Sequence, residues 1–202
     1  MIIGIAGGSG SGKTTLANRL VEELSHLTPV ILAMDNYYFP LERQAKDHKG
    51  KFNFDLPTAI DKENFIVDLM ELKKGKTLLI DEYHFNNPNI AASQIRIIPG
   101  QLIIVEGLFV QTFDELKGHL DFVIFVDLDE SQQLQRRIAR DNQQRDYDKL
   151  EVEYQWENHV RPCFEKYLAP YKNIADFRFD NNLIFDQELK RLTSEINNLL
   201  NQ

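Results

Sequence analysis

The stretch from Gly7 to Thr15 constrains the fold of this chain more than any other. It reads GGSGSGKTT and matches the pattern G-x-x-x-x-G-K-[ST] in full. The apolar residues 2–7 precede it, and leucines spaced three or four residues apart follow it within residues 13–27. This order predicts a buried strand, a tight loop and an amphipathic helix. A flexible Gly/Ser linker is the alternative interpretation, but it does not explain the flanking strand and helix.

The chemistry of this loop predicts a nucleoside triphosphate site. Glycines allow backbone N–H groups to turn toward phosphate oxygens, and the N-terminus of the following helix favours an anion. Lys13 can reach the β- and γ-phosphates, and the Thr14 hydroxyl can bind Mg²⁺. The motif does not indicate what receives the phosphate. The residues expected to hold the nucleotide are Gly7, Gly8, Ser9, Gly10, Ser11, Gly12, Lys13, Thr14 and Thr15.

The rest of the chain alternates apolar runs with helical patterns, which predicts a doubly wound α/β fold with a mostly parallel sheet flanked by helices. The further strands lack polar alternation, as is typical of a sheet covered on both faces. We expect one domain over residues 1–202, with a small two-stranded ribbon at about 77–100 and a helical lid at about 130–168. The other expected strands are 29–35, 101–107, 121–128 and 175–180, and the other expected helices are 61–75 and 187–200.

Composition excludes several classes of partner. The net charge is −8 and the pI about 5.2, which argues against binding of nucleic acid, because that needs clustered cations. The single Cys163 excludes an internal disulfide and a multi-cysteine metal site, and it fits a reducing compartment. No apolar run reaches the roughly 18 residues of a membrane span. We therefore expect a soluble, cytoplasmic protein with no nucleic-acid or membrane partner.

Acidic residues end three of the expected strands. In an open parallel sheet, ligands bind beyond the carboxyl ends of the strands, so Asp35 can accept the proton of an attacking hydroxyl. Glu106 can orient magnesium waters, and Asp127 is a rival for that role. Each of these residues can instead cap a turn. The string DHKG at 47–50 matches the D-x-x-G motif of GTPases, but it follows no strand, and an N-K-x-D motif is absent.

Two further groups of residues suggest a small anionic ligand with a planar part. Arg136, Arg137 and Arg140 fall close together on one expected helix and can neutralise a phosphoryl group, although a solvated charged face is the alternative. Tyr83 and Phe85 share one face of an expected strand, with His84 on the other, and planar aromatics suit a planar base. Asp55 can bind vicinal hydroxyls, whereas Phe52 and Phe54 can simply belong to a satellite core.

At these residues the chain resembles the uridine kinase family, enzymes that phosphorylate uridine and cytidine at the 5′-hydroxyl. The resemblance is carried, in order, by GGSGSGKTT, DNYY, FNFDLPTAID, EYHF, IIVEG, FVDLD, RRIARD, HVRP and YKNIAD. It implies a P-loop kinase fold, ATP or GTP as phosphate donor, Mg²⁺, and a nucleoside as acceptor. Family members are often tetramers, so the resemblance also implies a homo-oligomer.

The resemblance implies a role for each site residue. Asp35 would be the general base, with Lys13 and Arg140 at the phosphates, and Thr14 and Glu106 would serve magnesium. Substrate-binding residues would include Asp55 and Arg137 at the ribose and aromatic side chains at the base. The full expected substrate set is Tyr38, Phe54, Asp55, Tyr83, Phe85, Arg137 and Gln155.

The chain departs from the family pattern at two base-contacting positions. Pro88 stands where the family has a histidine, and Tyr147 stands where it has a lid arginine, although a shifted alignment supplies Arg145 instead. Losing hydrogen-bonding groups weakens discrimination between bases, which His84 or the asparagines at 86, 87 and 89 can restore. Two alternatives therefore stay open: a P-loop kinase for another hydroxyl metabolite, such as a different nucleoside, pantothenate or ribulose phosphate, and a nucleotide-binding regulator.

Overall fold

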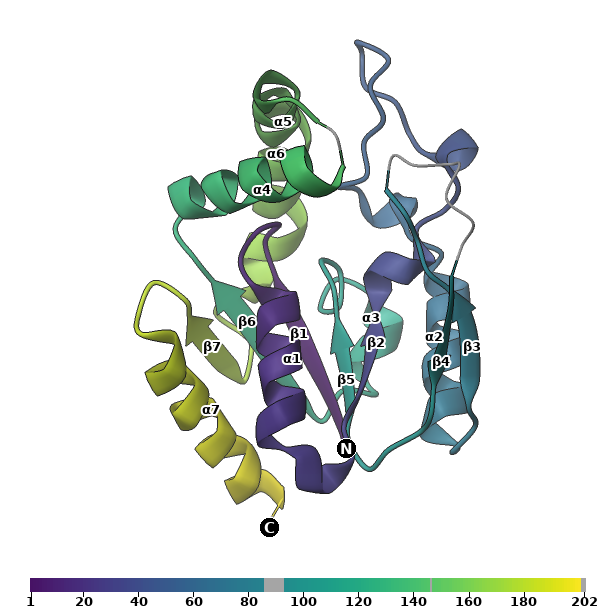
Figure 1. The fold of residues 1–202 in the computed structure, drawn as a ribbon, viewed down its shortest axis with the longest axis vertical. Helices are drawn as coiled ribbons and strands as arrows, with labels where there is room; N and C mark the ends of the chain where they lie inside the picture. Colours follow the sequence, from purple (N-terminus) through teal and green to yellow (C-terminus); the bar gives the residue numbers. More distant parts are fainter. Residues whose placement is uncertain (86–92, 146, 201–202) are drawn as a thin grey trace.

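A five-stranded parallel sheet forms the centre of the molecule in the computed structural model, which describes residues 1–85, 93–145 and 147–200 (Figure 1). The strands lie in the order β2-β5-β1-β6-β7, and Gly4 of β1 pairs with Val105 on one side and Val123 on the other. Because the strands are parallel, their carboxyl ends share one edge. The strands are β1 (Ile2–Gly7), β2 (Val30–Ala33), β5 (Ile103–Glu106), β6 (Phe122–Asp127) and β7 (Phe177–Asp180). The predicted sheet is confirmed.

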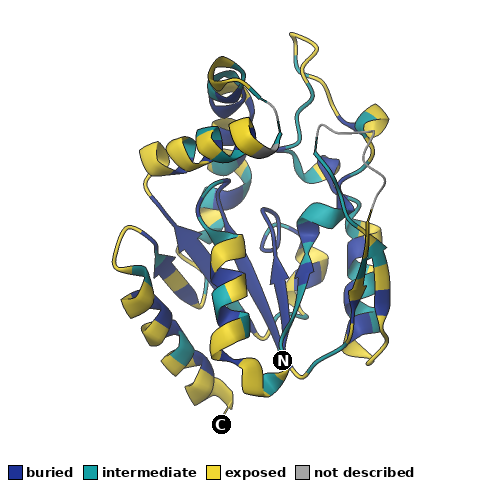
Figure 2. Ribbon diagram, viewed as in Figure 1, coloured by how far each residue is buried: buried dark blue, intermediate teal, exposed yellow. Residues whose placement is uncertain are grey.

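Helices cover both faces of this sheet. One face packs against α1 (Lys13–Glu23) and α7 (Phe185–Leu200), and the other packs against α2 (Lys62–Lys73) and α3 (Asp114–Lys117). Figure 2 shows the strands buried between these helices, whose outward faces are exposed. Sequence patterning does not predict the short helix α3, because a single turn is too short to show a helical period. Helix α1 ends earlier than predicted, and a 3₁₀ turn, Ser25–Leu27, continues it.

The predicted ribbon forms as an antiparallel pair, β3 (Leu78–Asp81) and β4 (Gln94–Ile97), that packs against α2. It is shorter than predicted. Strand β3 ends at Asp81, so the strand alternation expected for Tyr83, His84 and Phe85 was wrong. Pro88 and the three asparagines at 86, 87 and 89 lie outside the described residues.

The predicted lid lies across the carboxyl edge of the sheet. It consists of α4 (Glu130–Gln144) and a second helical segment that contains α5 (Lys149–Gln155) and α6 (Arg161–Cys163). Two π-helical turns, Trp156–Val160 and Phe164–Leu168, flank α6. Pro162 lies between them and has no N–H for an α-helical hydrogen bond. Within the described part of the chain, no helix is long and apolar enough to cross a membrane.

Candidate active site

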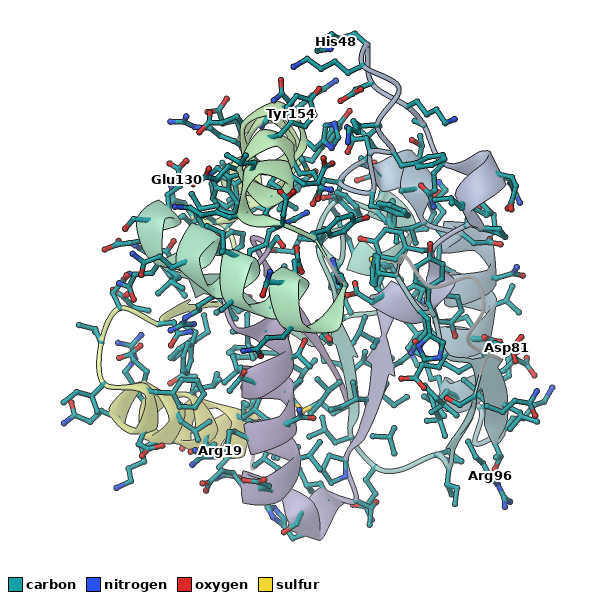
Figure 3. The ribbon with its side chains drawn as sticks, turned by 45° about the horizontal axis from the view of Figure 1, so that its top comes forward. Arg19, His48, Asp81, Arg96, Glu130 and Tyr154 are labelled. Atoms are coloured by element: carbon teal, nitrogen blue, oxygen red, sulfur yellow. The ribbon has the colours of Figure 1, made fainter. Side chains whose placement is uncertain are left out.

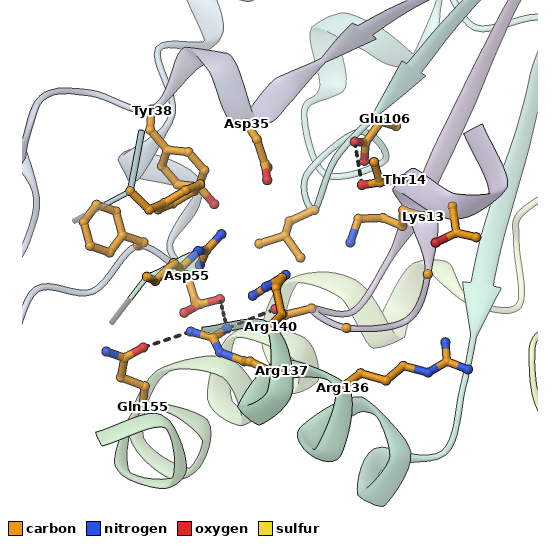
Figure 4. A pocket seen from close by; sticks show the side chains of 18 of the residues that line it. Lys13, Thr14, Asp35, Tyr38, Asp55, Glu106, Arg136, Arg137, Arg140 and Gln155 are labelled. Atoms are coloured by element: carbon orange, nitrogen blue, oxygen red, sulfur yellow. Dashed lines mark hydrogen bonds and ion pairs between the residues drawn. The ribbon is translucent and has the colours of Figure 1, made fainter. Parts of the chain in front are cut away.

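A cavity of about 510 Å³ opens at the carboxyl edge of the sheet, between the Gly7–Thr15 loop and the lid (Figure 4). It gathers most of the predicted site residues: Ser9, Gly10, Gly12, Lys13, Thr14, Thr15, Asp35, Tyr38, Phe54, Asp55, Phe85, Glu106, Arg137, Arg140 and Gln155. Its remaining lining comes from Leu108, Arg136, Arg145, Tyr147, Asn181 and Phe185. No sequence signal marks Leu108, Asn181 or Phe185, because none of them belongs to a motif.

The phosphate loop needs glycine at three positions, Gly7, Gly10 and Gly12, because all three have positive φ angles. Gly10 and Gly12 have φ angles of 79° and 103°, which other residues rarely adopt. A Cβ atom on Gly12 would lie 2.6 Å from Nδ2 of Asn181, which donates a 2.7 Å hydrogen bond to the Ser11 carbonyl. The connection between β7 and α7, which carries Asn181, therefore supports the loop and leaves no room for a side chain at residue 12.

Lys13, Glu106 and Asp35 form a compact charged group at the inner end of the cavity. The Thr14 hydroxyl donates a 3.0 Å hydrogen bond to Oε1 of Glu106, and Nζ of Lys13 donates one of 3.0 Å to the Gly8 carbonyl. Burial, together with the charge of Asp35, raises the pKa of Glu106 to about 7, against the influence of Lys13. Burial likewise lowers the pKa of Lys13, although Glu106 and Asp35 oppose it.

The two carboxylates of this group, Glu106 and Asp35, together with the Thr14 hydroxyl have the chemistry of a magnesium site. Mg²⁺ binds through one or two carboxylates completed by water and substrate phosphates. No cluster of three or more His, Cys, Asp or Glu side chains suited to a metal occurs in the described ranges, so phosphates would have to supply further ligands. The rival Asp127 forms ion pairs with Lys172 and Arg178 and does not line the cavity.

Arg137 connects the phosphate loop to the opposite end of the cavity. Its side chain is only 5% exposed, so the solvated-face interpretation was wrong for this residue. Nη1 donates hydrogen bonds to Oγ of Ser9 (3.0 Å) and Oδ1 of Asp55 (3.4 Å), and Nη2 donates to Oε1 of Gln155 (3.0 Å). Burial disfavours its charge, but the carboxylates of Asp55 and Asp141 outweigh burial and raise its pKa.

The lid makes the cavity locally cationic in an acidic protein. Lys13 and four arginines line it against three carboxylates, whereas the whole chain carries a charge of −8. Such a site favours an anionic ligand. The four arginines are Arg136, Arg137, Arg140 and Arg145.

Aromatic side chains form the wall beside Asp55. The rings of Tyr38 and Phe54 lie 4.9 Å and 5.7 Å from the Phe85 ring, and the Arg145 guanidinium lies 3.8 Å above it. Phe54 is one of the residues that line the cavity, so it is not merely part of a satellite core. Tyr83 does not line it, but packs against Phe85 with ring centroids 4.9 Å apart.

Of the residues considered at the two departures from the family pattern, Tyr147, Arg145 and His84 lie among the described residues. Tyr147 lines the cavity together with Arg145, so both residues considered for the lid position face the same space. His84 does not line it, and its Nε2 lies 3.8 Å from a carboxylate oxygen of Glu82.

The phosphate loop between β1 and α1, the parallel sheet and the basic lid define the class of P-loop kinases. The sequence model of the Phosphoribulokinase / Uridine kinase family matches residues 2–184. The chain therefore belongs to this family, and it is a phosphotransferase similar to the family's nucleoside kinases.

Individual relatives agree with this assignment. A uridine kinase of Staphylococcus carnosus is 34% identical over 201 residues, which cover 98% of this chain and 97% of that protein. Uridine-cytidine kinase A of Dictyostelium discoideum is 34% identical over 87% of this chain and 35% of its own length. A structure described as a possible uridine kinase from Bacillus stearothermophilus has a TM-score of 0.59, with 23% identity and coverage of 89% of this chain and 88% of that one. This last likeness concerns the fold alone.

Proposed function

We propose that this enzyme transfers the γ-phosphoryl group of ATP or GTP to the ribose 5′-hydroxyl of uridine or cytidine. One observation carries the proposal. A single cavity has the phosphate loop at one end, Asp55 and an aromatic wall at the other, and Asp35 between them. A donor phosphate and a hydroxyl-bearing acceptor can therefore meet between Lys13 and Asp35.

Each charged residue has a distinct task in the proposed reaction. Asp35 accepts the proton of the attacking hydroxyl, and Lys13 and Arg140 offset the charge of the moving phosphoryl group. Thr14 and Glu106 would hold magnesium, which when bound neutralises charge on the donor phosphates. Catalysis of this kind depends mainly on positioning and electrostatics.

The far end of the cavity suits a nucleoside. The Asp55 carboxylate accepts a hydrogen bond from Arg137 and can accept others from vicinal ribose hydroxyls. Gln155, held by the same guanidinium, lies beside it. The aromatic wall of Tyr38, Phe54 and Phe85 offers ring faces and edges to a planar base.

The donor base would lie at the opposite rim. Arg136, Asn181 and Phe185 line the cavity together with Gly12 and Thr15, on the side where a bound triphosphate would leave the loop. A guanidinium and an aromatic ring can both pack against a purine.

A second candidate is transfer to a different hydroxyl metabolite. Tyr147 favours it if the alignment has no gap, because a phenol then lines the cavity at the position where the family has a base-contacting arginine, whereas a shifted alignment puts Arg145 at that position. A tyrosine offers one donor, whereas an arginine offers five in a fork. A different hydrogen-bonding pattern selects a different acceptor.

The test is a kinase assay with purified protein, ATP or GTP, Mg²⁺ and a panel of acceptors at one concentration. We expect uridine and cytidine 5′-monophosphates as products, and a fall in kcat of about 10²–10⁴-fold in Asp35→Asn. Asp127→Asn, at the carboxyl end of β6 in the same sheet but outside the cavity, is the control and should keep its turnover. Near-wild-type kcat in Asp35→Asn would remove Asp35 as the base. Turnover of another acceptor without any pyrimidine nucleoside would favour the second candidate.

A further inference from the structure

The loop that leads to Asp55 touches the lid outside the cavity. Oδ2 of Asp47 lies 2.7 Å from the Tyr154 hydroxyl and 2.8 Å from Nε2 of His159. None of these three residues lines the cavity, and we call them the clasp. Figure 3 shows the loop that carries His48 at the same end of the molecule as Tyr154. Asp47 belongs to the string DHKG, whose resemblance to a GTPase motif has no structural counterpart.

The two oxygens of the Asp47 carboxylate have separate partners. Oδ1 accepts hydrogen bonds from the backbone N–H groups of Lys49 (2.8 Å) and Lys51 (2.9 Å), which organise the loop itself. Oδ2 accepts the bonds from the lid. Lys51 adds a 2.7 Å ion pair with Glu151 of α5. One side chain therefore shapes the loop and also fixes it to the helix.

Electrostatics support this arrangement. Desolvation opposes the charge of Asp47, but the hydrogen bonds from Tyr154 and His159, with those from the loop backbone, outweigh it and lower its pKa. An ionised carboxylate only accepts hydrogen bonds, so Nε2 of His159 carries the hydrogen in this contact. The His159 side chain is 1% exposed, so this contact is shielded from water.

The helix geometry that builds the clasp is unusual. Residues five apart in an α-helix point roughly 140° away from each other, because each turn takes 3.6 residues. Tyr154 and His159 nevertheless reach the same carboxylate oxygen, because the π-helical turn Trp156–Val160 winds more widely. The π-helical turn therefore places both side chains on the loop.

Both sides of the clasp continue directly to acceptor-site residues. The loop closes with a 2.8 Å hydrogen bond from the Asn53 N–H to the Ala45 carbonyl, and the Asn53 side chain accepts a 2.9 Å bond from the Asp55 N–H. On the lid, Tyr154 is followed by Gln155, which accepts a hydrogen bond from Arg137. A movement of the loop away from the lid would displace Asp55 from its partners.

We propose that Asp47 is a positioning residue that holds the acceptor loop against the lid through Tyr154 and His159, and so sets the affinity for the acceptor. This inference rests on the proposed function for its kinetic readout. The clasp touches neither the phosphate loop nor the donor rim, so its effect on the donor should be much smaller than its effect on the acceptor.

Steady-state kinetics of Asp47→Ala and Tyr154→Phe test the inference, with whichever acceptor the wild type phosphorylates. We expect KM for the acceptor to rise about tenfold or more, because a hydrogen bond to a charged group is lost, while KM for the donor changes much less and kcat changes less than the acceptor KM. The control is Asp68→Ala, which removes a matching 2.7 Å contact from the Tyr37 hydroxyl at a carboxylate that does not line the cavity. It should leave the acceptor KM unchanged.

Limited trypsin digestion gives a second readout that needs no acceptor. Cleavage after the exposed residues Lys49 and Lys51 should be faster in both clasp variants than in the wild type, with cleavage elsewhere unchanged. If the wild type phosphorylates no nucleoside but the two variants are still cleaved faster than the wild type after Lys49 and Lys51, the proposed function fails and the contact between the loop and the lid is supported. The inference would be overturned by equal digestion rates in the wild type and the variants. It would also be overturned by an unchanged acceptor KM, or by KM values for acceptor and donor that rise by the same factor. If Asp47→Ala does not fold, Tyr154→Phe, which removes one hydroxyl, decides the question.

Discussion

Replacing Glu106 by glutamine should stabilise the ligand-free protein above neutral pH while it removes activity. Glu106 is 5% exposed, and its pKa rises from 4.5 to about 7 through burial and the nearby charge of Asp35. At 1.36 kcal/mol per pKa unit, the ionised side chain lowers the free energy of unfolding by up to about 3 kcal/mol at pH 8. Glutamine keeps an oxygen for the Thr14 hydroxyl but carries no charge.

The sign of the effect follows from proton binding. Between about pH 4.5 and pH 7, the folded protein keeps a proton on Glu106 that the unfolded chain has released. The free energy of unfolding of the wild type therefore falls as pH rises through this window, and Glu106→Gln lacks that fall. The pKa of about 7 already includes the attraction of Lys13, so we expect a net gain of up to about 3 kcal/mol at pH 8 and little gain at pH 5.

Urea unfolding without magnesium or nucleotide measures this difference at pH 5 and pH 8. Asp127→Asn is a control of opposite sign, because ion pairs with Lys172 and Arg178 outweigh desolvation and lower its pKa, so it should destabilise at pH 8. The kinase assay with Mg²⁺ should show a loss of about 10²-fold or more in Glu106→Gln. A variant less stable than the wild type at pH 8, or a difference that does not vary with pH, would refute the reasoning.

Two further substitutions test the connections around the phosphate loop. Arg137→Met removes the shared partner of two buried carboxylates, so urea unfolding should show a loss of about 3–5 kcal/mol, and a near-neutral result would contradict the pairing of Arg137 with Asp55 and Asp141. Gly12→Ala places a Cβ 2.6 Å from Nδ2 of Asn181 at a φ of 103°, so calorimetric titration should show nucleotide binding weakened about tenfold or more. Gly75→Ala, also at positive φ but with open space around it, should leave nucleotide binding intact.

Those parts of the site that depend on local structure can be predicted from the sequence. The residues of the phosphate loop are adjacent in the sequence. The local backbone conformation alone therefore places its glycines, Lys13 and Thr14 relative to one another. Asp35 and Glu106 lie at or just beyond strand ends, and a parallel sheet brings such ends to one edge whatever the loops do. The amino-acid pattern alone is therefore enough to place these residues together.

Contacts between distant loops cannot be predicted in this way. Asn181 supports the phosphate loop from a connection 170 residues further along, and Asp47 meets His159 across 112 residues. No periodic pattern encodes such pairs, because they depend on how the lid and the loops pack. The strand alternation applied to Phe85 failed for a related reason: β3 ends before it, and the turn that follows brings it to the cavity.

Arg137 contacts both the phosphate loop and the proposed acceptor end of the cavity, so it can couple the binding of the two proposed substrates. One guanidinium donates to Ser9 in the phosphate loop and to Asp55 at the acceptor end, so a ligand that shifts it from one side changes the free energy of binding on the other. Linkage then requires reciprocity: any factor by which the donor tightens the acceptor is the factor by which the acceptor tightens the donor. Any cooperativity between donor and acceptor that passes through Arg137 would therefore be equal in both directions.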